Sequence, residues 1–318
     1  MDVMAYNGPL MKTLSLSFAG YQGTQSIHTK AAIVFGEGVK ARHPGPVNFE
    51  LEPDVLSKGY KSGDLLGLVE RNEFNMCYIS SIRFSGVVPA LKIFELPFLI
   101  QDRQKIYDAL DGALGDHLKT LMEAATPYRV LGFWDNGFRH LTNSVRPIRM
   151  PEDCQGLRLR IQMSDFLIKA FKPFGFDPVT MDIKDFIDQL GSNDADAVNA
   201  HENPLTNIAN FKIHEHQKYI TLTGHILGVA MMLCNKDVYH AWPADVRAAV
   251  DAAAAEASHA QREFAMAEDE VALSTFDPAR VDVVQLSADE RKAFEAAAAP
   301  LVEAHRDEIG AELFDYLR

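Results

Sequence analysis

Arginine and asparagine side chains near the ends of expected strands are the strongest candidates for binding chemistry in this sequence. Arg158 and Arg160 lie in the strand-like segment Gly156–Ile161. Side chains of a strand repeat every two residues, so both guanidinium groups are expected on one face. A guanidinium group can pair with both oxygens of a carboxylate, which makes this face a candidate anion site. The alternative is an edge strand whose arginines face solvent.

Arg139 and Asn203 are two further candidates for contact with a ligand. Arg139 follows an expected strand ending at Phe133 and its polar turn, and ligands bind near the carboxyl ends of strands in open α/β sheets. The alternative for Arg139 is a surface ion pair with one of the 44 acidic residues. Asn203 precedes Pro204, which favours extended backbone and an amide presented outward. Asparagine before proline is also an ordinary turn signal, so that interpretation stays open.

Histidines and enzyme motifs give no support for a metal site or for catalysis. His214 and His216 flank Glu215, but ligands two residues apart on a helix diverge, and no third ligand has helical spacing. His225, on an apolar segment, is expected to be a hydrogen-bonded core residue. The chain has no nucleophile elbow, phosphate-binding loop, dinucleotide fingerprint or zinc-protease motif. We therefore expect no metal, no cofactor and no enzymatic activity.

Composition restricts the class of protein and of partner. A chain of 318 residues with 47% hydrophobic and 24% charged residues is an ordinary globular protein, long enough for two domains or two lobes. The formal charge of -13 opposes binding to nucleic acid or to an acidic membrane. The same charge repels an anionic ligand, so a carboxylate site needs arginines placed locally. No apolar stretch of 18 residues is present, and no segment is expected to span a bilayer.

The cysteines and the first residues bear on the cellular compartment of the protein. Cys77, Cys154 and Cys234 are far apart, which excludes a Cys-x-x-Cys motif and favours small buried apolar residues. If the protein is exported, at least one of these thiols is unpaired within the monomer. Met1–Leu16 lacks a basic segment, a continuous apolar run and a cleavage site, so no export signal is visible. Either the protein is cytoplasmic, or its leader has been removed or replaced.

Alternation of apolar and polar residues predicts the elements that position these side chains. In the first part of the chain, strands and helices alternate, which predicts a mainly parallel sheet covered on both faces. The expected strands are 13–18, 47–51 and 74–79, and the expected helices are 26–41, with Ser26 as N-cap, and 64–71. The same alternation of strands and helices recurs in the middle of the chain and predicts a second sheet. The expected strands there are 130–133, 157–161, 179–181 and 197–199, and the helices are 164–174 and 183–190.

The last third of the chain is expected to form two extended segments and then long helices. The segments 219–223 and 229–234 are apolar and extended, and Pro243 opens a long helix with which the chain returns to the first lobe. Ser287 and Glu290 have the spacing of a capping box, which predicts a helix start there. This helix should stop near Pro300, and a final helix should run through Leu317.

An ordered set of short segments resembles the solute receptors of TRAP (tripartite ATP-independent periplasmic) transporters, of the dicarboxylate-binding type. The resemblance runs from about Ser15 to the C-terminus. The segments are Leu96-Pro97-Phe98-Leu99, Gly137–Asn143, Arg146-Pro147-Ile148 with Pro151-Glu152-Asp153, Gly156–Ile161, Glu202-Asn203-Pro204, Thr221–His225 and Trp242-Pro243.

The resemblance assigns roles to the candidate residues. It implies that Arg160 pairs bidentately with a ligand carboxylate, that Arg139 assists it, and that Asn203 reaches the ligand. The stretch between Leu190 and Glu202, with Asn193-Asp194-Ala195-Asp196, is a few residues longer than in the family. Either Asn203 or Asn199 therefore occupies the ligand-facing position.

The other lobe and the aromatic residues complete the expected site. Tyr21 and the turn Ser80-Ser81 each follow an expected strand, so we expect them to face the ligand from the first lobe. Trp134 and Phe138 flank Arg139 and could form an apolar wall, although core packing is the more common role of a single aromatic residue.

The resemblance also implies a fold, a function and a location. The fold is an α/β two-lobed periplasmic-binding-protein clamshell with interleaved segments and long C-terminal helices. Lobe 1 is expected at 1–136 plus about 228–270, and lobe 2 at 137–227 plus about 271–318. The function implied is periplasmic capture of a small organic acid anion and its delivery to TRAP membrane subunits. The alternatives are a small-molecule hydrolase or lyase and a cytoplasmic carboxylate-sensing module.

Overall fold

The computed structural model describes residues 12–317, apart from 193 and 195. The expectation about an export signal falls mostly on residues 1–11, which lie outside the described residues. Two residues of the long stretch before Glu202, Asn193 and Ala195, lie outside them as well.

The first part of the chain has the alternating strands and helices that the sequence predicts. Ser26 caps the first helix as expected, because its side chain accepts a hydrogen bond from the Thr29 amide. The first strand pairs in parallel with both the second and the third. The elements are β1 (Leu14–Ala19), α1 (Ile27–Arg42), β2 (Val47–Glu52), α2 (Asp64–Glu70) and β3 (Met76–Ser80).

Two long antiparallel strands replace the short ones expected in the middle of the chain. β4 (Tyr128–Asn143) and β8 (Tyr219–Asn235) pair along most of their length. The polar turn expected directly after Phe133, formed by Asp135 and Asn136, is wrong, since these residues lie inside β4. The β4–β8 register shifts between Asp135 and Gly137, so Asn136 is an extra residue in a bulge. Polar residues and a glycine at a bulge resemble a turn in sequence, which explains the error.

The two expected sheets form one mixed sheet, because β4 and β8 belong to both halves. The order is β2-β1-β3-β8-β4-β7-β5-β6, with β9 (Asp282–Gln285) also paired to β8. The remaining strands are β5 (Arg158–Ile161), β6 (Asp177–Thr180) and β7 (Ala200–Pro204). The strand expected at 197–199 is displaced to β7, whose polar residues are all buried and hide the usual alternation.

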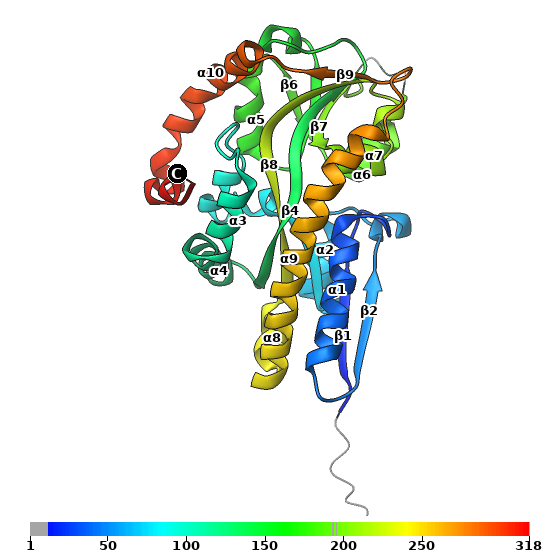
Figure 1. Cartoon of the computed structure of the whole chain (residues 1–318), viewed down its shortest axis with the longest axis vertical. Helices are drawn as coiled ribbons and strands as arrows, with labels where there is room; N and C mark the ends of the chain where they lie inside the picture. The colour runs from blue at the N-terminus through cyan, green and yellow to red at the C-terminus, as the bar shows by residue number, and fades with distance from the viewer. Residues whose placement is uncertain (1–11, 193, 195, 318) are drawn as a thin grey trace, which may run out of the picture.

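Helices cover both faces of this sheet. Figure 1 shows α9 alongside β4 and β8 as these strands cross from one half of the molecule to the other. The helices after α2 are α3 (Arg103–Asp111), α4 (Ala113–Ala125), α5 (Asp165–Phe171), α6 (Ile183–Gln189), α7 (Leu205–Asn210), α8 (Lys236–Ala241), α9 (Ala244–Ser274), α10 (Ala288–Ala304) and α11 (Arg306–Ile309). Short 3-10 helices include Ser81–Phe84, Pro89–Phe94 and Ala311–Leu317.

The helix starts at Pro243 and Ser287 are confirmed, but the expected stop at Pro300 is wrong. Pro243 is the N-cap of α9, and Ser287 and Glu290 form the capping box of α10. α10 continues through Pro300 to Ala304, because the lost amide hydrogen bond is offset by packing of the helix on both sides of the proline. Phe294 and Ala298 are buried there, and Leu301 packs beside them.

The C-terminal segment returns to the apolar core around α3 and α4. Ile309, Leu313 and Phe314 belong to one buried cluster with Tyr107 and Leu118. In Figure 1 the chain accordingly descends from α10 to end beside α3. The three cysteines are buried and unpaired, as expected for small core residues.

Candidate functional site

A small polar cavity lies where the loops after β1 and β3 meet the strands β4, β5 and β7. About 360 Å³ of space there, part of it open solvent, is not filled by atoms. Four of the predicted site residues, Arg160, Arg139, Asn203 and Tyr21, line this cavity. The other lining residues are Ser62, Arg83, Asn136, Gln162, Ile183, Asn207 and Phe211.

Arg160 on β5 is buried and retains donor capacity. Its Nε donates to the Met181 carbonyl oxygen at 2.9 Å, and its Nη1 lies 3.4 Å from His201 Nε2. Within the described part of the chain, Nη2 has no hydrogen-bond partner. Burial lowers the pKa of Arg160 to about 10, against the opposing effect of Glu202. An anion placed beside this guanidinium would restore the stability of its charged form.

His201 positions Arg160 and Asn203 through a single ring nitrogen. Its Nε2 lies 3.4 Å from Arg160 Nη1 and 3.3 Å from Asn203 Nδ2, and both partners are donors. Nε2 is therefore assigned as the acceptor, with the proton on Nδ1. Burial and the charge of Arg160 hold the pKa of His201 well below its usual value, so the ring is neutral. The ring also stacks on Phe186, with centroids 4.5 Å apart.

Arg139 on β4 forms a buried ion pair with Glu202 on β7. Its Nε and Nη2 donate to the two carboxylate oxygens, and Nη2 also reaches the Glu202 carbonyl oxygen at 2.8 Å. Burial raises the pKa of Glu202, but Arg139 and His225 outweigh it and lower the pKa to about 2. Nη1 of Arg139 is buried and has no hydrogen-bond partner among the described residues. The surface ion pair considered from the sequence is therefore a buried one, and Arg139 keeps a spare donor.

The structure places Asn203, and not Asn199, at the cavity. Asn203 Oδ1 accepts a hydrogen bond from Asn207 Nδ2 at 3.2 Å, which extends the polar chain beyond His201. Asn199 instead lies outside the cavity and accepts from the Arg158 amide at 3.0 Å. Arg158 is only partly buried and pairs with Asp177, so the two arginines of β5 have different surroundings.

Arg83 is a cavity residue that the sequence reasoning missed. It lies in the 3-10 helix directly after β3, and its Nη2 donates to Ser62 Oγ at 2.6 Å and to Asp182 Oδ2 at 2.7 Å. Burial raises the pKa of Asp182, but the Lys184 amide, Ser62 and Arg83 together lower it. The rule that pointed to Ser80-Ser81 would have found Arg83 if it had been extended by two residues.

Four predicted residues do not line this cavity. Ser80 and Ser81 are buried at the start of the 3-10 helix that carries Arg83. Trp134 is a core residue, stacked on Phe18 at 6.1 Å and hydrogen-bonded to Ser258. Phe138 neighbours Arg139 on the strand and therefore points to the opposite face.

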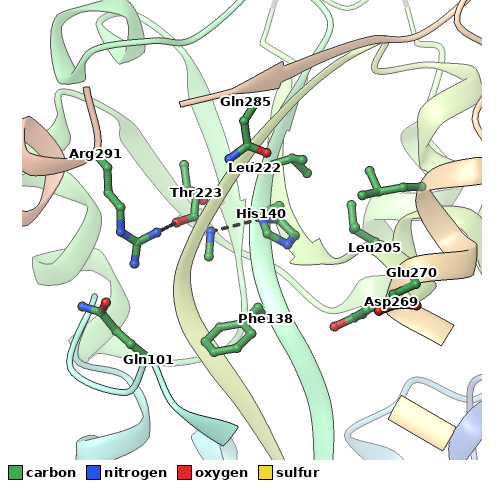
Figure 2. A pocket seen from close by; sticks show the side chains of 12 residues that line it. Gln101, Phe138, His140, Leu205, Leu222, Thr223, Asp269, Glu270, Gln285 and Arg291 are labelled. Atoms are coloured by element: carbon green, nitrogen blue, oxygen red, sulfur yellow. Dashed lines mark hydrogen bonds between the residues drawn. The ribbon is translucent and has the colours of Figure 1, made fainter. Parts of the chain in front are cut away.

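Phe138 lies in a larger, more open hollow on that opposite face, shown in Figure 2. Arg291 there donates to the Thr223 carbonyl oxygen at 2.8 Å, and His140 accepts from the Gly224 amide at 3.1 Å. Asp269 and Glu270 add negative charge to its wall. The smaller cavity, with two spare guanidinium donors, is therefore the better site for an anion.

Neither a metal centre nor a membrane span is found in the part of the chain that the structure describes. No three His, Cys, Asp or Glu side chains among these residues are arranged to hold a metal ion. His225 is buried, with its Nδ1 2.6 Å from Thr223 Oγ1, as expected for a hydrogen-bonded core residue. No helix among the described residues is long and apolar enough to cross a membrane.

The cavity combines two spare arginine donors with neutral amides and a hydroxyl, between parts of the chain that are far apart in sequence. This arrangement is that of a site that binds a small anionic solute. Residues 18–308 match the family described as bacterial extracellular solute-binding protein, family 7, and the chain belongs to this family.

Relatives and solved structures agree with this assignment. The chain is 29% identical to the 2,3-diketo-L-gulonate-binding periplasmic protein YiaO of Escherichia coli, over 92% of this chain and 87% of that one. It is also 29% identical to the C4-dicarboxylate-binding periplasmic protein DctP of Rhodobacter capsulatus, over 95% and 90%. The sugar acid binding protein of Advenella mimigardefordensis, solved with galactonate, superposes with a TM-score of 0.89 at 25% identity, over 96% and 98%.

These comparisons confirm the two-lobed α/β fold and the solute-receptor interpretation. The family consists of solute-binding proteins, so the hydrolase or lyase alternative is excluded. The protein is a receptor that binds a solute between its lobes.

Proposed function

We propose that this receptor binds a small organic acid and holds its carboxylate on Arg160. The observation that carries this proposal is the buried guanidinium of Arg160, which faces the cavity with an unused donor at Nη2. A guanidinium group and a carboxylate match in geometry and charge. Arg139 Nη1 and the amides of Asn203 and Asn207 are further groups that could contact the ligand.

The proposal extends to the partner and the compartment. We infer that the receptor works in the periplasm and delivers its ligand to TRAP membrane subunits, as expected for a relative of periplasmic binding proteins. Cell fractionation of the native host tests this: the protein should be released with the periplasmic fraction. Recovery only from the cytosol would overturn this location and favour a sensing module.

We propose that the lobes are 1–136 with about 228–270, and 137–227 with about 271–318. Gly137 pairs with Gly228 where the register of β4 and β8 shifts, and this supports a boundary there. The segment 306–317 packs against α3 and the 3-10 helix 89–94, so it would tie the end of lobe 2 to lobe 1.

Native mass spectrometry and thermal denaturation test the proposed function. Protein purified without refolding should carry a small acid as added mass. A carboxylate present at a hundred times its dissociation constant should stabilise the protein by about 2.7 kcal/mol through mass action. Small-angle scattering on the same samples should show a more compact particle with ligand. A broad carboxylate panel with no stabilisation, and no product formed, would contradict the assignment.

A further inference from the structure

The charges around the cavity are almost balanced before any ligand enters. Three guanidinium groups line it, those of Arg83, Arg139 and Arg160. Two buried carboxylates lie behind them: Asp182 binds Arg83, and Glu202 binds Arg139. Among residues 12–317 without 193 and 195, Arg160 forms no ion pair, since its partners are a carbonyl oxygen and a neutral histidine. One positive charge therefore remains uncompensated.

The rest of the wall carries no charge and is mostly polar, with Ile183 and Phe211 as its apolar residues. Tyr21, Asn136, Gln162, Asn203 and Asn207 supply hydroxyl and amide groups, which both donate and accept hydrogen bonds. Several of these amides already bond one another, with Asn207 Nδ2 3.5 Å from Asn136 Oδ1. Such groups match hydroxyl and carbonyl oxygens of a ligand.

We infer that the ligand is a monocarboxylate that carries hydroxyl or keto groups, and not a dicarboxylate. This inference rests on the proposed function, since it takes the carboxylate to lie on Arg160. A second carboxylate would be buried among amides without a free cation, and burial of an unpaired charge is strongly unfavourable. The net charge of -13 on the chain adds to the repulsion of a dianion.

A pair of four-carbon acids gives a direct test by calorimetric titration. The probes are 2,3,4-trihydroxybutanoate, which has one carboxylate, and succinate, which has two. We expect the monocarboxylate to bind at least tenfold more tightly. Tighter binding of succinate would overturn the inference and leave the proposed function intact, whereas failure of a whole panel of mono- and dicarboxylates would reject the proposed function itself.

Asp182→Asn tests the charge balance that underlies this preference. Asparagine retains the acceptor that caps α6 at the Lys184 amide, but it frees the charge of Arg83. We expect the affinity ratio of succinate to 2,3,4-trihydroxybutanoate to rise at least tenfold. The control is Asp185→Asn on the same helix, whose carboxylate pairs with the exposed Lys61. An unchanged ratio in a folded Asp182→Asn protein, or an equal rise in the control, would contradict the proposal.

Discussion

Arg160 illustrates how burial prepares a side chain for a ligand. Its guanidinium is held by a carbonyl oxygen at Nε and by a neutral histidine at Nη1, and neither partner cancels the charge. Burial already lowers its pKa to about 10, so the charged form lacks stabilisation in the absence of an anion. Binding of a carboxylate stabilises the charged guanidinium, and this gain in stability favours the ligand-bound state.

Arg160→Ala and Arg160→Lys should both weaken ligand binding. Truncation to alanine leaves a carboxylate desolvated and unpaired, with an expected loss of about 3–5 kcal/mol, or roughly a hundredfold to several-thousandfold in affinity. Lysine keeps the charge but not the planar pair of donors, so it should also impair binding. Calorimetric titration measures both.

The unliganded Arg160→Ala protein provides the control for folding. The variant loses the hydrogen bonds to Met181 and His201 but also removes a buried charge without a counterion, so its melting temperature should change little. Near-normal affinity in both variants would show that the carboxylate binds elsewhere.

The sequence predicted some residues of this site and could not predict others. Arg160 and Asn203 were predicted because an ordered set of short segments carries them. The pairing of Arg139 with Glu202 depends on the register between β4 and β7, which places Arg139 opposite Pro204 and beside the Glu202 carboxylate. The position of the Arg83 side chain depends on its ion pair with Asp182, which is distant in sequence and adjacent only in the folded chain.

At the scale of elements, the bulge in β4 turns the chain where it enters the second half of the sheet. Gly137 has φ +89°, a conformation that other residues adopt at a cost, and its amide donates to Asp135 Oδ1. A Cβ at this position would lie 2.8 Å from the Cβ of Pro204 on β7. Both backbone strain and close packing therefore require glycine.

Gly137→Ala should lower the free energy of unfolding by roughly 2–3 kcal/mol, as the sum of a backbone cost of about 1 kcal/mol and a steric cost of about 1–2 kcal/mol. Gly156→Ala is the matched control, because φ there is +76° but no atom of the described part of the chain lies within 4 Å of the added Cβ. The control should show the backbone cost alone. Urea unfolding measures both, and equal losses would show that contact with Pro204 contributes nothing.

The long strands also show why the elements were only partly predictable. The strands and helices of the first part of the chain follow regular alternation and ordinary caps, and the sequence predicted them closely. β4 and β8 are interrupted by register shifts, and glycine at such positions resembles a turn when read from sequence alone. β4 and β8 join the two expected sheets into one through pairing between residues that are far apart in sequence. A local sequence pattern cannot predict such pairing.

At the scale of the whole molecule, a buried carboxyl group lies between the two proposed lobes. Glu95, just after the 3-10 helix 89–94, is fully buried, and its Oε2 accepts from Ser164 Oγ at 2.5 Å. Ser164 is the N-cap of α5, on the other side of the proposed boundary. Burial raises the pKa of Glu95 from 4.5 to about 7, although Ser164, Ser85 and Lys92 act in the opposite direction. The carboxyl group therefore titrates near neutral pH in the folded protein.

The raised pKa of Glu95 predicts a stability that falls as pH rises from 4.5 to 7. The folded state holds a proton that the unfolded state releases over this range. The contribution of Glu95 to the free energy of unfolding is therefore complete below pH 4.5 and lost above pH 7. At 1.36 kcal/mol per unit, the change attributable to Glu95 is about 3 kcal/mol.

Glu95→Gln, which keeps an acceptor for Ser164 but does not titrate, should remove this component. The measurement is urea unfolding at pH 4.5 and 7.5, and the informative quantity is the difference between native protein and variant at each pH, because other carboxyl groups cancel in it. The free energy of unfolding of the variant, relative to that of native protein, should be roughly 2–3 kcal/mol higher at pH 7.5 than at pH 4.5. Glu303→Gln, exposed on α10, should show no such shift. If the free energy of unfolding had the same pH dependence in native protein and Glu95→Gln, titration of Glu95 at its contact with Ser164 would not contribute to stability.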